Sequence, residues 1–219
     1  MTRPMVILSD FDGTIITEDA SQLVLSRFGG NGWIKYDEMF ARGEMGFEEC
    51  VSKEFGLIGV GKPEILREYD RLVSPRKHFP LLISYARERG IPFTIVSGGL
   101  EFLIKEFLKR NGLKETVDLY VGRLRCGRGG MRVSFPTPRV PGSVNFKDDL
   151  VLQEKQRGKS VVYIGDGTSD FNAALNSDLA FAVRGSRLAA LGRQAAAPFL
   201  EFENFSEIVR ALRGAPSGD

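Results

Sequence analysis

The chain has 219 residues, of which 42% are hydrophobic and 26% charged, and its formal net charge is +2. This composition excludes disordered, collagen-like and disulfide-scaffold proteins, and the near balance of charge gives no reason to expect nucleic acid as a partner. No apolar run approaches the roughly 18 residues of a membrane helix, so we expect no membrane partner. The amino terminus lacks the apolar core of a secretory signal, and we therefore expect a cytoplasmic protein.

Short apolar runs alternate with helical patterns along the chain. Each run ends in a polar, glycine-rich turn, which predicts an α/β fold with a doubly wound (Rossmann-like) parallel sheet. The expected strands are residues 5–9, 92–97, 160–164 and 179–183, with a weaker fifth at 198–202. The expected helices are residues 80–89, 100–110, 147–156, 170–175 and 203–213.

Residues 10–91 separate the first two expected strands, which is far more chain than a single crossover helix needs. Most of this stretch has helical periodicity. We therefore predict a small helical cap at residues 15–75 and an α/β catalytic core made of residues 1–14 and 76–219. Trp33 and the cap phenylalanines are interpreted as cap core. Residues 119–124 and 131–135 flank a glycine-rich tip and predict a β-hairpin.

Carboxylates follow the first and third expected strands. Asp10 and Asp12 come after the first, and Asp166 and Asp170 after the third. Because the carboxyl ends of parallel strands meet at one edge of the sheet, we expect Asp10, Asp12 and Asp166 to converge. Three hard oxygen ligands suit Mg²⁺, and without a cation such a cluster would repel itself. Asp170 is expected to hold the loop or the metal.

The end of the second expected strand has the character of an anion site. Ser97 and Gly98 precede a helix, so a hydroxyl, backbone amides and a helix amino terminus meet there. A phosphate beside several carboxylates needs a cation nearby. The helix that starts at Lys147 and the strand that returns to Asp166 have similar lengths, which brings Lys147 level with Asp166. Lys159 falls at the opposite edge.

In this order, the motifs around Asp10, Ser97, Lys147 and Asp166 resemble the four motifs of the haloacid dehalogenase superfamily. The cap inserted after the first motif is similar to that of the phosphoserine phosphatase-like branch. The resemblance implies that Asp10 is a nucleophile that forms an aspartyl-phosphate. It also implies that Asp12 protonates the leaving oxygen and then activates water.

The resemblance further implies the binding roles of the remaining motif residues. The residues implied to hold the phosphoryl group are Ser97, Gly98 and Lys147. Those implied to hold Mg²⁺ are Asp10, the Asp12 main-chain carbonyl and Asp166, with Asp170 in support.

Two positions depart from the phosphoserine phosphatase pattern. That family places a glutamate nine residues after the nucleophile to meet the substrate amine, and this chain has Asp19 there, preceded by Glu18. The family's arginine for the substrate carboxylate falls on Glu54. Because an acid cannot pair with a carboxylate, phosphoserine is not the expected substrate. Glu18, Asp19 and Glu54 are candidates for contacts to a cationic or hydroxylated substrate end.

We therefore predict a magnesium-dependent phosphomonoester hydrolase, a monomer or small homo-oligomer that acts on a small phosphorylated metabolite. One alternative is a phosphotransferase or mutase with the same intermediate, which release of phosphate without an acceptor would exclude. A second is a phospho-receiver signalling module. The cap and Asp12 disfavour it, because a receiver keeps its phosphoryl group.

Overall fold

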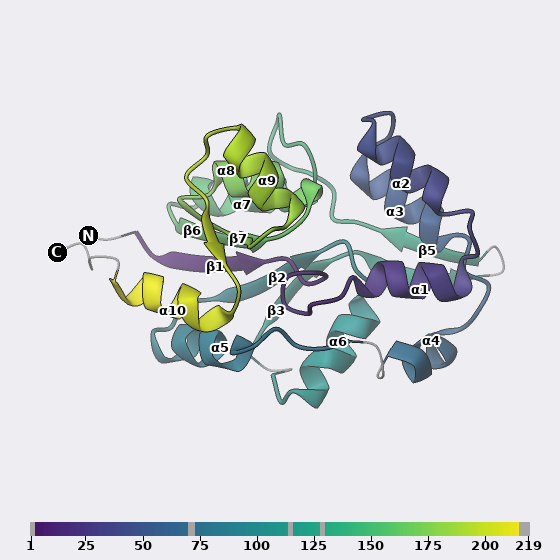
Figure 1. Ribbon diagram of the computed structural model, residues 1–219, viewed down its shortest axis with the longest axis horizontal. Coiled ribbons are helices and arrows are strands. Elements are labelled where there is room, and N and C mark those ends of the chain that lie inside the picture. Colours follow the sequence, from purple (N-terminus) through teal and green to yellow (C-terminus); the bar gives the residue numbers. More distant parts are fainter. Residues whose placement is uncertain (1–2, 70–72, 114–115, 128–129, 215–219) are drawn as a thin grey trace.

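The computed structural model describes residues 3–69, 73–113, 116–127 and 130–214 (Figure 1). Its six-stranded sheet is parallel throughout, with the order β3-β2-β1-β6-β7-β8. The strands are β1 (Met5–Ser9), β2 (Phe93–Ser97), β3 (Asp118–Val121), β6 (Ser160–Gly165), β7 (Leu179–Val183) and β8 (Leu200–Phe202). The order reverses between β1 and β6, so the predicted doubly wound sheet is confirmed, and its ligand crevice belongs at that reversal.

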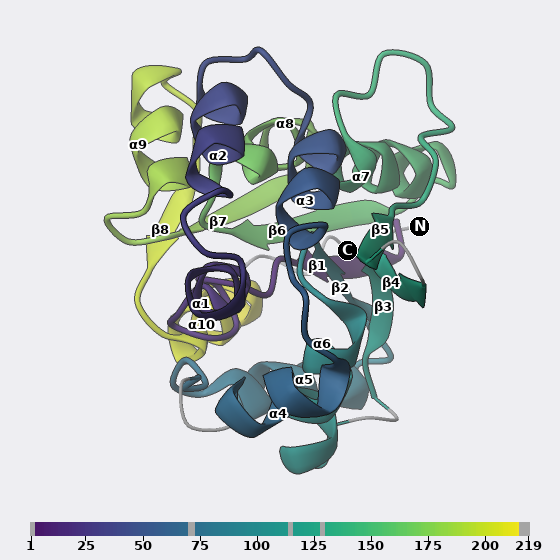
Figure 2. The ribbon, with the colours of Figure 1, turned by 90° about the vertical axis from the view of Figure 1, so that its right-hand side faces the viewer.

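Helices cover both faces of the sheet (Figures 1 and 2). One face carries α5 (Phe79–Glu88), α6 (Glu101–Arg110) and α10 (Phe205–Gly214), and the other carries α7 (Phe146–Gln156), α8 (Phe171–Asn176) and α9 (Arg187–Gln194). A 3₁₀ turn, Thr168–Asp170, leads into α8. Within the described residues, no helix combines the length and the apolar character needed to cross a membrane.

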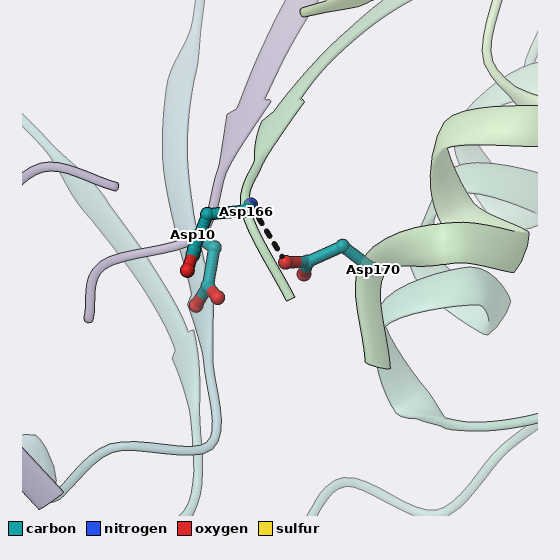
Figure 3. A group of neighbouring side chains, drawn as sticks. All are labelled: Asp10, Asp166 and Asp170. Carbon is teal, nitrogen blue, oxygen red and sulfur yellow. Dashed lines mark hydrogen bonds between the residues drawn. The ribbon is translucent and has the colours of Figure 1, made fainter. Parts of the chain in front are cut away.

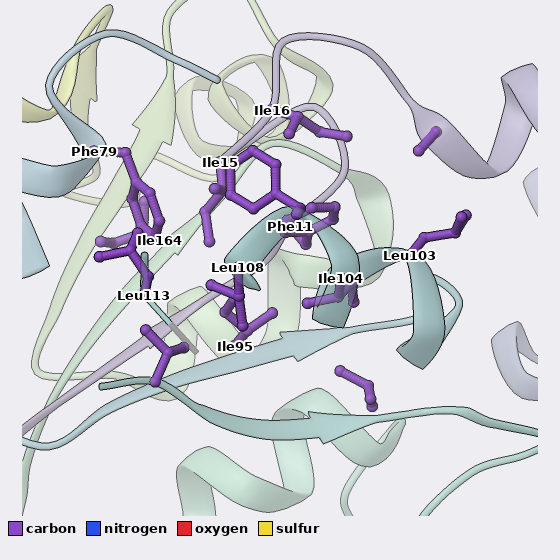
Figure 4. Close-up of a cluster of buried hydrophobic side chains, with 14 of the residues drawn as sticks. Phe11, Ile15, Ile16, Phe79, Ile95, Leu103, Ile104, Leu108, Leu113 and Ile164 are labelled. Atoms are coloured by element: carbon purple, nitrogen blue, oxygen red, sulfur yellow. The ribbon is translucent and has the colours of Figure 1, made fainter. Parts of the chain in front are cut away.

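Two apolar cores explain why the strand sequences are continuously hydrophobic. In β1, Ile7 packs into the core on the α5 side, whereas Val6 and Leu8 pack into the core on the α7 side. Strands that are buried on both faces cannot alternate apolar and polar residues. Figure 4 shows the larger core, in which Phe11 and Ile164 lie among side chains of α5 and α6.

Four helices lie beyond the carboxyl ends of the strands (Figure 1). They are α1 (Ala20–Phe28), α2 (Ile34–Ala41), α3 (Phe47–Phe55) and α4 (Lys62–Tyr69). The chain leaves the sheet and returns at one place, where Ile16 pairs with Pro75 and the Thr17 amide donates to the Ser74 carbonyl at 3.0 Å. This pairing agrees with a cap boundary near residues 15 and 75, and the division into two units stays a prediction.

The predicted hairpin exists, but its first arm was placed wrongly. β4 (Arg123–Gly127) pairs with β5 (Gly130–Ser134), whereas Asp118–Val121 pairs in parallel with β2 as the edge strand β3. Gly122 divides the apolar run, and a Cβ there would lie 2.8 Å from Val133. Residues 128 and 129 of the glycine-rich tip lie outside the described residues.

Helix α9 was not predicted. Its buried positions are Leu188, Ala189 and Gly192, so small residues provide most of its packed face. A face of this kind gives only a weak hydrophobic period in the sequence. The helix matters for the site, because the Leu188 amide donates to the Asp166 carbonyl at 2.7 Å.

Candidate active site

A buried ammonium group lies between two carboxylates at the reversal of the strand order. Lys147, in the first turn of α7, places its Nζ 2.9 Å from Asp10 Oδ2 and 2.7 Å from Asp170 Oδ1. Asp10 follows β1 directly, and its amide donates to the Ile164 carbonyl of β6 at 2.8 Å. Residues separated by more than a hundred positions therefore meet at one point, as the sequence predicted.

The start of α7 is fixed by a side-chain cap. Asn145 accepts hydrogen bonds from the Lys147 amide at 2.9 Å and the Asp148 amide at 3.0 Å, and it is almost fully buried. Its Nδ2 donates to the Ser169 carbonyl at 2.9 Å. One asparagine thus satisfies the helix terminus and ties Lys147 to the loop that follows β6.

Asp166 and Asp170 have different surroundings although both follow β6. Asp166 accepts a 2.7 Å hydrogen bond from Thr14 Oγ1, and its carboxylate lies beside that of Asp10 in Figure 3. Asp170 is fully buried, and both of its oxygens accept hydrogen bonds, one from Lys147 and Tyr163, the other from the amides of Asp166 and Gly167. Asp170 is therefore saturated and supports the loop.

The residues present fit a divalent cation. Carboxylate oxygens of Asp10, Asp166 and Asp170 all lie within 4.8 Å of one another. Because Asp170 is already satisfied by four donors, Asp10 and Asp166 are the side chains with capacity left for a metal. Oxygen donors of this kind are those that Mg²⁺ prefers.

The pKa shifts describe the same crowding of negative charge. Burial and the neighbouring Asp170 carboxylate raise the pKa of Asp10 well above its usual range and that of Asp166 to about 7. Burial disfavours the charged forms of Lys147 and Asp170, but other effects outweigh it. The carboxylates of Asp10 and Asp170 raise the pKa of Lys147, and the Lys147 ammonium lowers the pKa of Asp170. A cation between Asp10 and Asp166 would relieve this repulsion.

Asp12 is held by the cap. Its Oδ1 accepts from the Ala20 amide and its Oδ2 from Ser21 Oγ, both at 3.0 Å, at the amino terminus of α1. Burial and the Asp19 carboxylate raise the pKa of Asp12 to about 8. A carboxyl group that is protonated near neutral pH can donate a proton to a leaving group.

Glycines permit the close approaches in this region. Gly13 has a φ of 68°, and a Cβ there would lie 2.3 Å from Asp166 Oδ2. A Cβ on Gly98 would lie 2.4 Å from Phe47 Cζ of the cap. Ser97, which precedes it, is buried, and its Oγ accepts from the Gly99 amide at 3.0 Å. Ser97, Gly98 and Gly99 of this turn all line the cavity between the core and the cap.

Core and cap enclose a cavity of about 160 Å³. It brings together most of the predicted site residues, namely Asp10, Asp12, Asp19, Glu54, Ser97, Gly98, Lys147 and Asp166. Glu18 is not among them, because its carboxylate accepts from the Ser74 amide at the base of the cap. Asp170 lies behind Lys147.

Several cavity residues were missed or misinterpreted from the sequence. Ser21, Asp37, Trp33 and Phe40 also line the cavity. Of the residues interpreted as cap core, Phe55 is fully buried, whereas Trp33 packs against the core but is half-buried, as is Phe40. Their spacing is that of ordinary amphipathic helices. A signal that marks them as cavity residues is absent from the sequence, because it depends on how the cap folds over the sheet.

The fold and the site together define an enzyme with a doubly wound α/β fold and with an aspartate and a lysine at its topological switch point. A family model described as haloacid dehalogenase-like hydrolase matches residues 7–175, and the chain belongs to this family. The family and the enzyme class, a phosphatase, agree with the sequence-based prediction.

Individual relatives are distant. The chain is 26% identical over 187 residues to 2-hydroxy-3-keto-5-methylthiopentenyl-1-phosphate phosphatase of Bacillus velezensis, covering 83% of this chain and 79% of that one. It is 24% identical over 228 residues to polyol phosphate phosphatase PYP1 of Saccharomyces cerevisiae, covering 98% and 95%. A bifunctional enzyme MtnB/MtnX of Bacillus licheniformis is 28% identical over 187 residues, and the chain spans 43% of its length.

The solved structures agree on the fold. A phosphoserine phosphatase structure titled as a phospho-aspartyl intermediate analogue has a TM-score of 0.71 and 19% sequence identity. The similarity covers 96% of this chain and 99% of that one. The two chains therefore share their overall fold, although few of their residues are identical.

Proposed function

We propose that the protein is a magnesium-dependent phosphomonoester hydrolase that acts on a small phosphorylated metabolite through an aspartyl-phosphate on Asp10. The observation that carries the proposal is the contact of Lys147 with Asp10, next to Asp166 and under a cap. The similar phosphatases support it, since those named above act on small phosphate esters according to their names. A small substrate also suits the modest cavity.

In the proposed reaction a carboxylate oxygen of Asp10 forms a bond to phosphorus while the bond from phosphorus to the alcohol oxygen breaks. Asp12 gives its proton to that oxygen. It then takes a proton from a water molecule, which attacks phosphorus, releases phosphate and restores Asp10. Dividing the displacement into two steps in this way lowers each barrier.

The remaining residues stabilise charge. Lys147, Ser97 and the Gly98 amide would hold the phosphoryl oxygens, because phosphoryl transfer depends mainly on positioning and charge neutralisation. Asp10, the Asp12 carbonyl and Asp166 would hold Mg²⁺, which supplies positive charge to the phosphoryl group when bound. The cap would exclude bulk water during the first step.

Phosphate release from an aryl phosphate, with and without Mg²⁺, tests the proposal. We expect activity only with the metal, and a loss of about a hundredfold or more in Asp10→Asn. Asp118→Asn is a matched control, because Asp118 is exposed on the edge strand and lies outside the cavity. Release without an added acceptor distinguishes hydrolysis from transfer. Full activity of Asp10→Asn would contradict the proposed nucleophile.

A further inference from the structure

The cap contributes acidic and aromatic side chains to the cavity wall. Asp19 precedes α1, Asp37 lies in α2 and Glu54 lies in α3, and all three line the cavity together with the rings of Trp33 and Phe40. Among the described lining residues, six carboxylates face the cavity and Lys147 supplies the one cationic side chain. Among the described residues of the wall, acidic side chains therefore outnumber cationic ones by six to one.

The catalytic groups do not remove this excess. The Lys147 ammonium is already engaged by Asp10 and Asp170, at 2.9 and 2.7 Å. A phosphate dianion and a divalent cation would bring opposite charges that cancel. Of the cap carboxylates, Asp19 already accepts a 2.8 Å hydrogen bond from the Gln22 amide at the start of α1, so Asp37 and Glu54 are left to interact with the alcohol part of the substrate.

Glu54 is the most enclosed of these carboxylates. It is 7% exposed, and in the described part of the chain its hydrogen-bond partner is the Cys50 thiol, a weak donor one turn earlier in α3. No lysine or arginine of the described residues forms an ion pair with it. Burial and the nearby carboxylates of Asp37 and Asp19 raise the pKa of Glu54 to about 7, against the lowering effect of the Cys50 hydrogen bond. Aromatic faces such as those of Trp33 and Phe40 also attract cations.

We propose that the cap wall binds an ammonium group of the substrate, with Glu54 as its main partner, and that the enzyme selects small aminoalkyl phosphates. This inference rests on the proposed function and adds the substrate class. A carboxylate in the same position would be repelled by three acids. A neutral alkyl group would leave the buried charge of Glu54 without a partner, which is unfavourable.

Matched substrates test the charge alone. Aminoalkyl phosphates with two to four carbons are compared with alkyl phosphates of the same number of heavy atoms, and with the corresponding hydroxyalkyl and carboxyalkyl phosphates. We expect kcat/KM for the best aminoalkyl phosphate to exceed that of its alkyl counterpart about tenfold or more. Equal values, or a preference for the hydroxyl or carboxylate compound, would overturn the inference.

A pair of variants assigns the preference to Glu54. Glu54→Gln keeps the size of the side chain and removes its charge, so the ratio between aminoalkyl and alkyl phosphates should fall towards one. Glu49→Gln is the control, because Glu49 lies in the same helix with a 60% exposed side chain that pairs with Lys53. Its ratio should match that of the wild type. An unchanged ratio in a folded Glu54→Gln protein would contradict the assignment.

Binding measurements separate this inference from the proposed function. Calorimetry with wild-type protein, Mg²⁺ and non-hydrolysable phosphonates compares 3-aminopropylphosphonate with butylphosphonate. Tighter binding of the amine would support the inference even if no phosphomonoester were hydrolysed, in which case the proposed function alone would fail. Equal affinity, together with normal turnover of an aryl phosphate, would remove the inference and leave the phosphatase.

Discussion

Ser21 connects the cap to the proposed general acid. Its hydroxyl donates to Asp12 Oδ2 at 3.0 Å, while the neighbouring Ala20 amide donates to Oδ1 at the same distance. Both donors belong to α1, whereas Asp12 belongs to the loop after β1. The orientation of Asp12 therefore depends on the position of α1.

Ser21→Ala should lower kcat about three- to tenfold, since a hydrogen bond of this kind contributes about 0.5–1.5 kcal/mol. KM should change less, because the hydroxyl orients Asp12 rather than binding the phosphoryl group. Ser21→Thr keeps a hydroxyl and should recover most of the activity. Steady-state kinetics of both variants decides the matter, and an unchanged kcat in Ser21→Ala would show that the Ala20 amide alone suffices.

Gly98 and Phe47 form a second contact between core and cap. A Cβ at position 98 would lie 2.4 Å from the Phe47 ring, which also packs on Phe146 of α7. Gly98→Ala should displace the ring and lower kcat/KM about tenfold or more. Adding Phe47→Leu should restore part of the loss, which a double-mutant cycle measures. Gly46→Ala is the control, since a Cβ there contacts nothing within 4 Å. Strictly additive effects would argue against the contact.

For individual residues, the sequence predicts those of the core motifs better than those of the cap. Asp10, Lys147 and Asp166 are recognisable because each directly follows a strand or starts a helix, and parallel strands bring such positions together. Ser21 and Trp33 carry no comparable signal. Their contacts arise from the way α1 and α2 pack against the sheet, which local periodicity does not encode.

Helix α7 owes its role to its first turn. Asn145 accepts from two amides of that turn and donates to the Ser169 carbonyl, so the helix cap and the loop after β6 form one unit. The amides of Phe146, Lys147 and Asp148 are engaged by Glu48 and Asn145, so α7 contributes to the cavity through the Lys147 side chain, whose Nζ lies 2.9 Å from Asp10 Oδ2.

Asn145→Ala should lower the free energy of unfolding by about 1–2 kcal/mol. It should also reduce kcat, because the first turn of α7, which carries Lys147, loses the side-chain cap that holds it in place. Asn204→Ala is the matched control: Asn204 accepts from the Ser206 amide at the start of α10, away from the cavity. The control should lose stability and keep its activity. Urea unfolding and initial rates of both variants provide the comparison. Equal losses of activity would indicate a general effect of instability.

Elements with strong patterns were predicted closely, and elements with weak patterns were not. The expected strand at residues 5–9 agrees with β1. The edge strand β3 was joined to the hairpin because the apolar run continues past Gly122, and only pairing with β2 separates the two. Sheet partners are determined by tertiary structure, so sequence spacing alone cannot assign a short edge strand.

Over the whole molecule, charge is divided between the cap segment and the rest. Residues 15–75 contain eleven acidic and seven basic side chains out of 28 and 30 in the chain, so this segment is net −4 and the remainder net +6. The overall charge of +2 conceals this division. Three acidic residues of the cap, Asp19, Asp37 and Glu54, line the cavity and lie close together. Because like charges repel one another, the stability of the folded protein should depend on pH.

The contribution of Glu54 to this pH dependence can be measured. Burial raises its pKa from 4.5 to about 7, and the neighbours that face it are Cys50 in its own helix, Asp37 in α2 and Asp19 before α1. Between these two pKa values the folded protein binds more protons at this site than the unfolded chain. The free energy of unfolding therefore decreases as the pH rises from about 4.5 to 7, by at most about 3 to 4 kcal/mol from this group.

Glu54→Gln imitates the protonated side chain at every pH. Relative to the wild type, we expect the variant to be equally stable below pH 4.5 and more stable above pH 7, with the difference growing across that interval. Urea unfolding at several pH values measures the difference directly, and other acids with raised pKa values cancel because both proteins contain them. Glu49→Gln should show no such trend, since its side chain is 60% exposed. A Glu54→Gln protein whose advantage is independent of pH would mean that Glu54 is already ionised at low pH, and therefore that the cap holds it near a cation or in water.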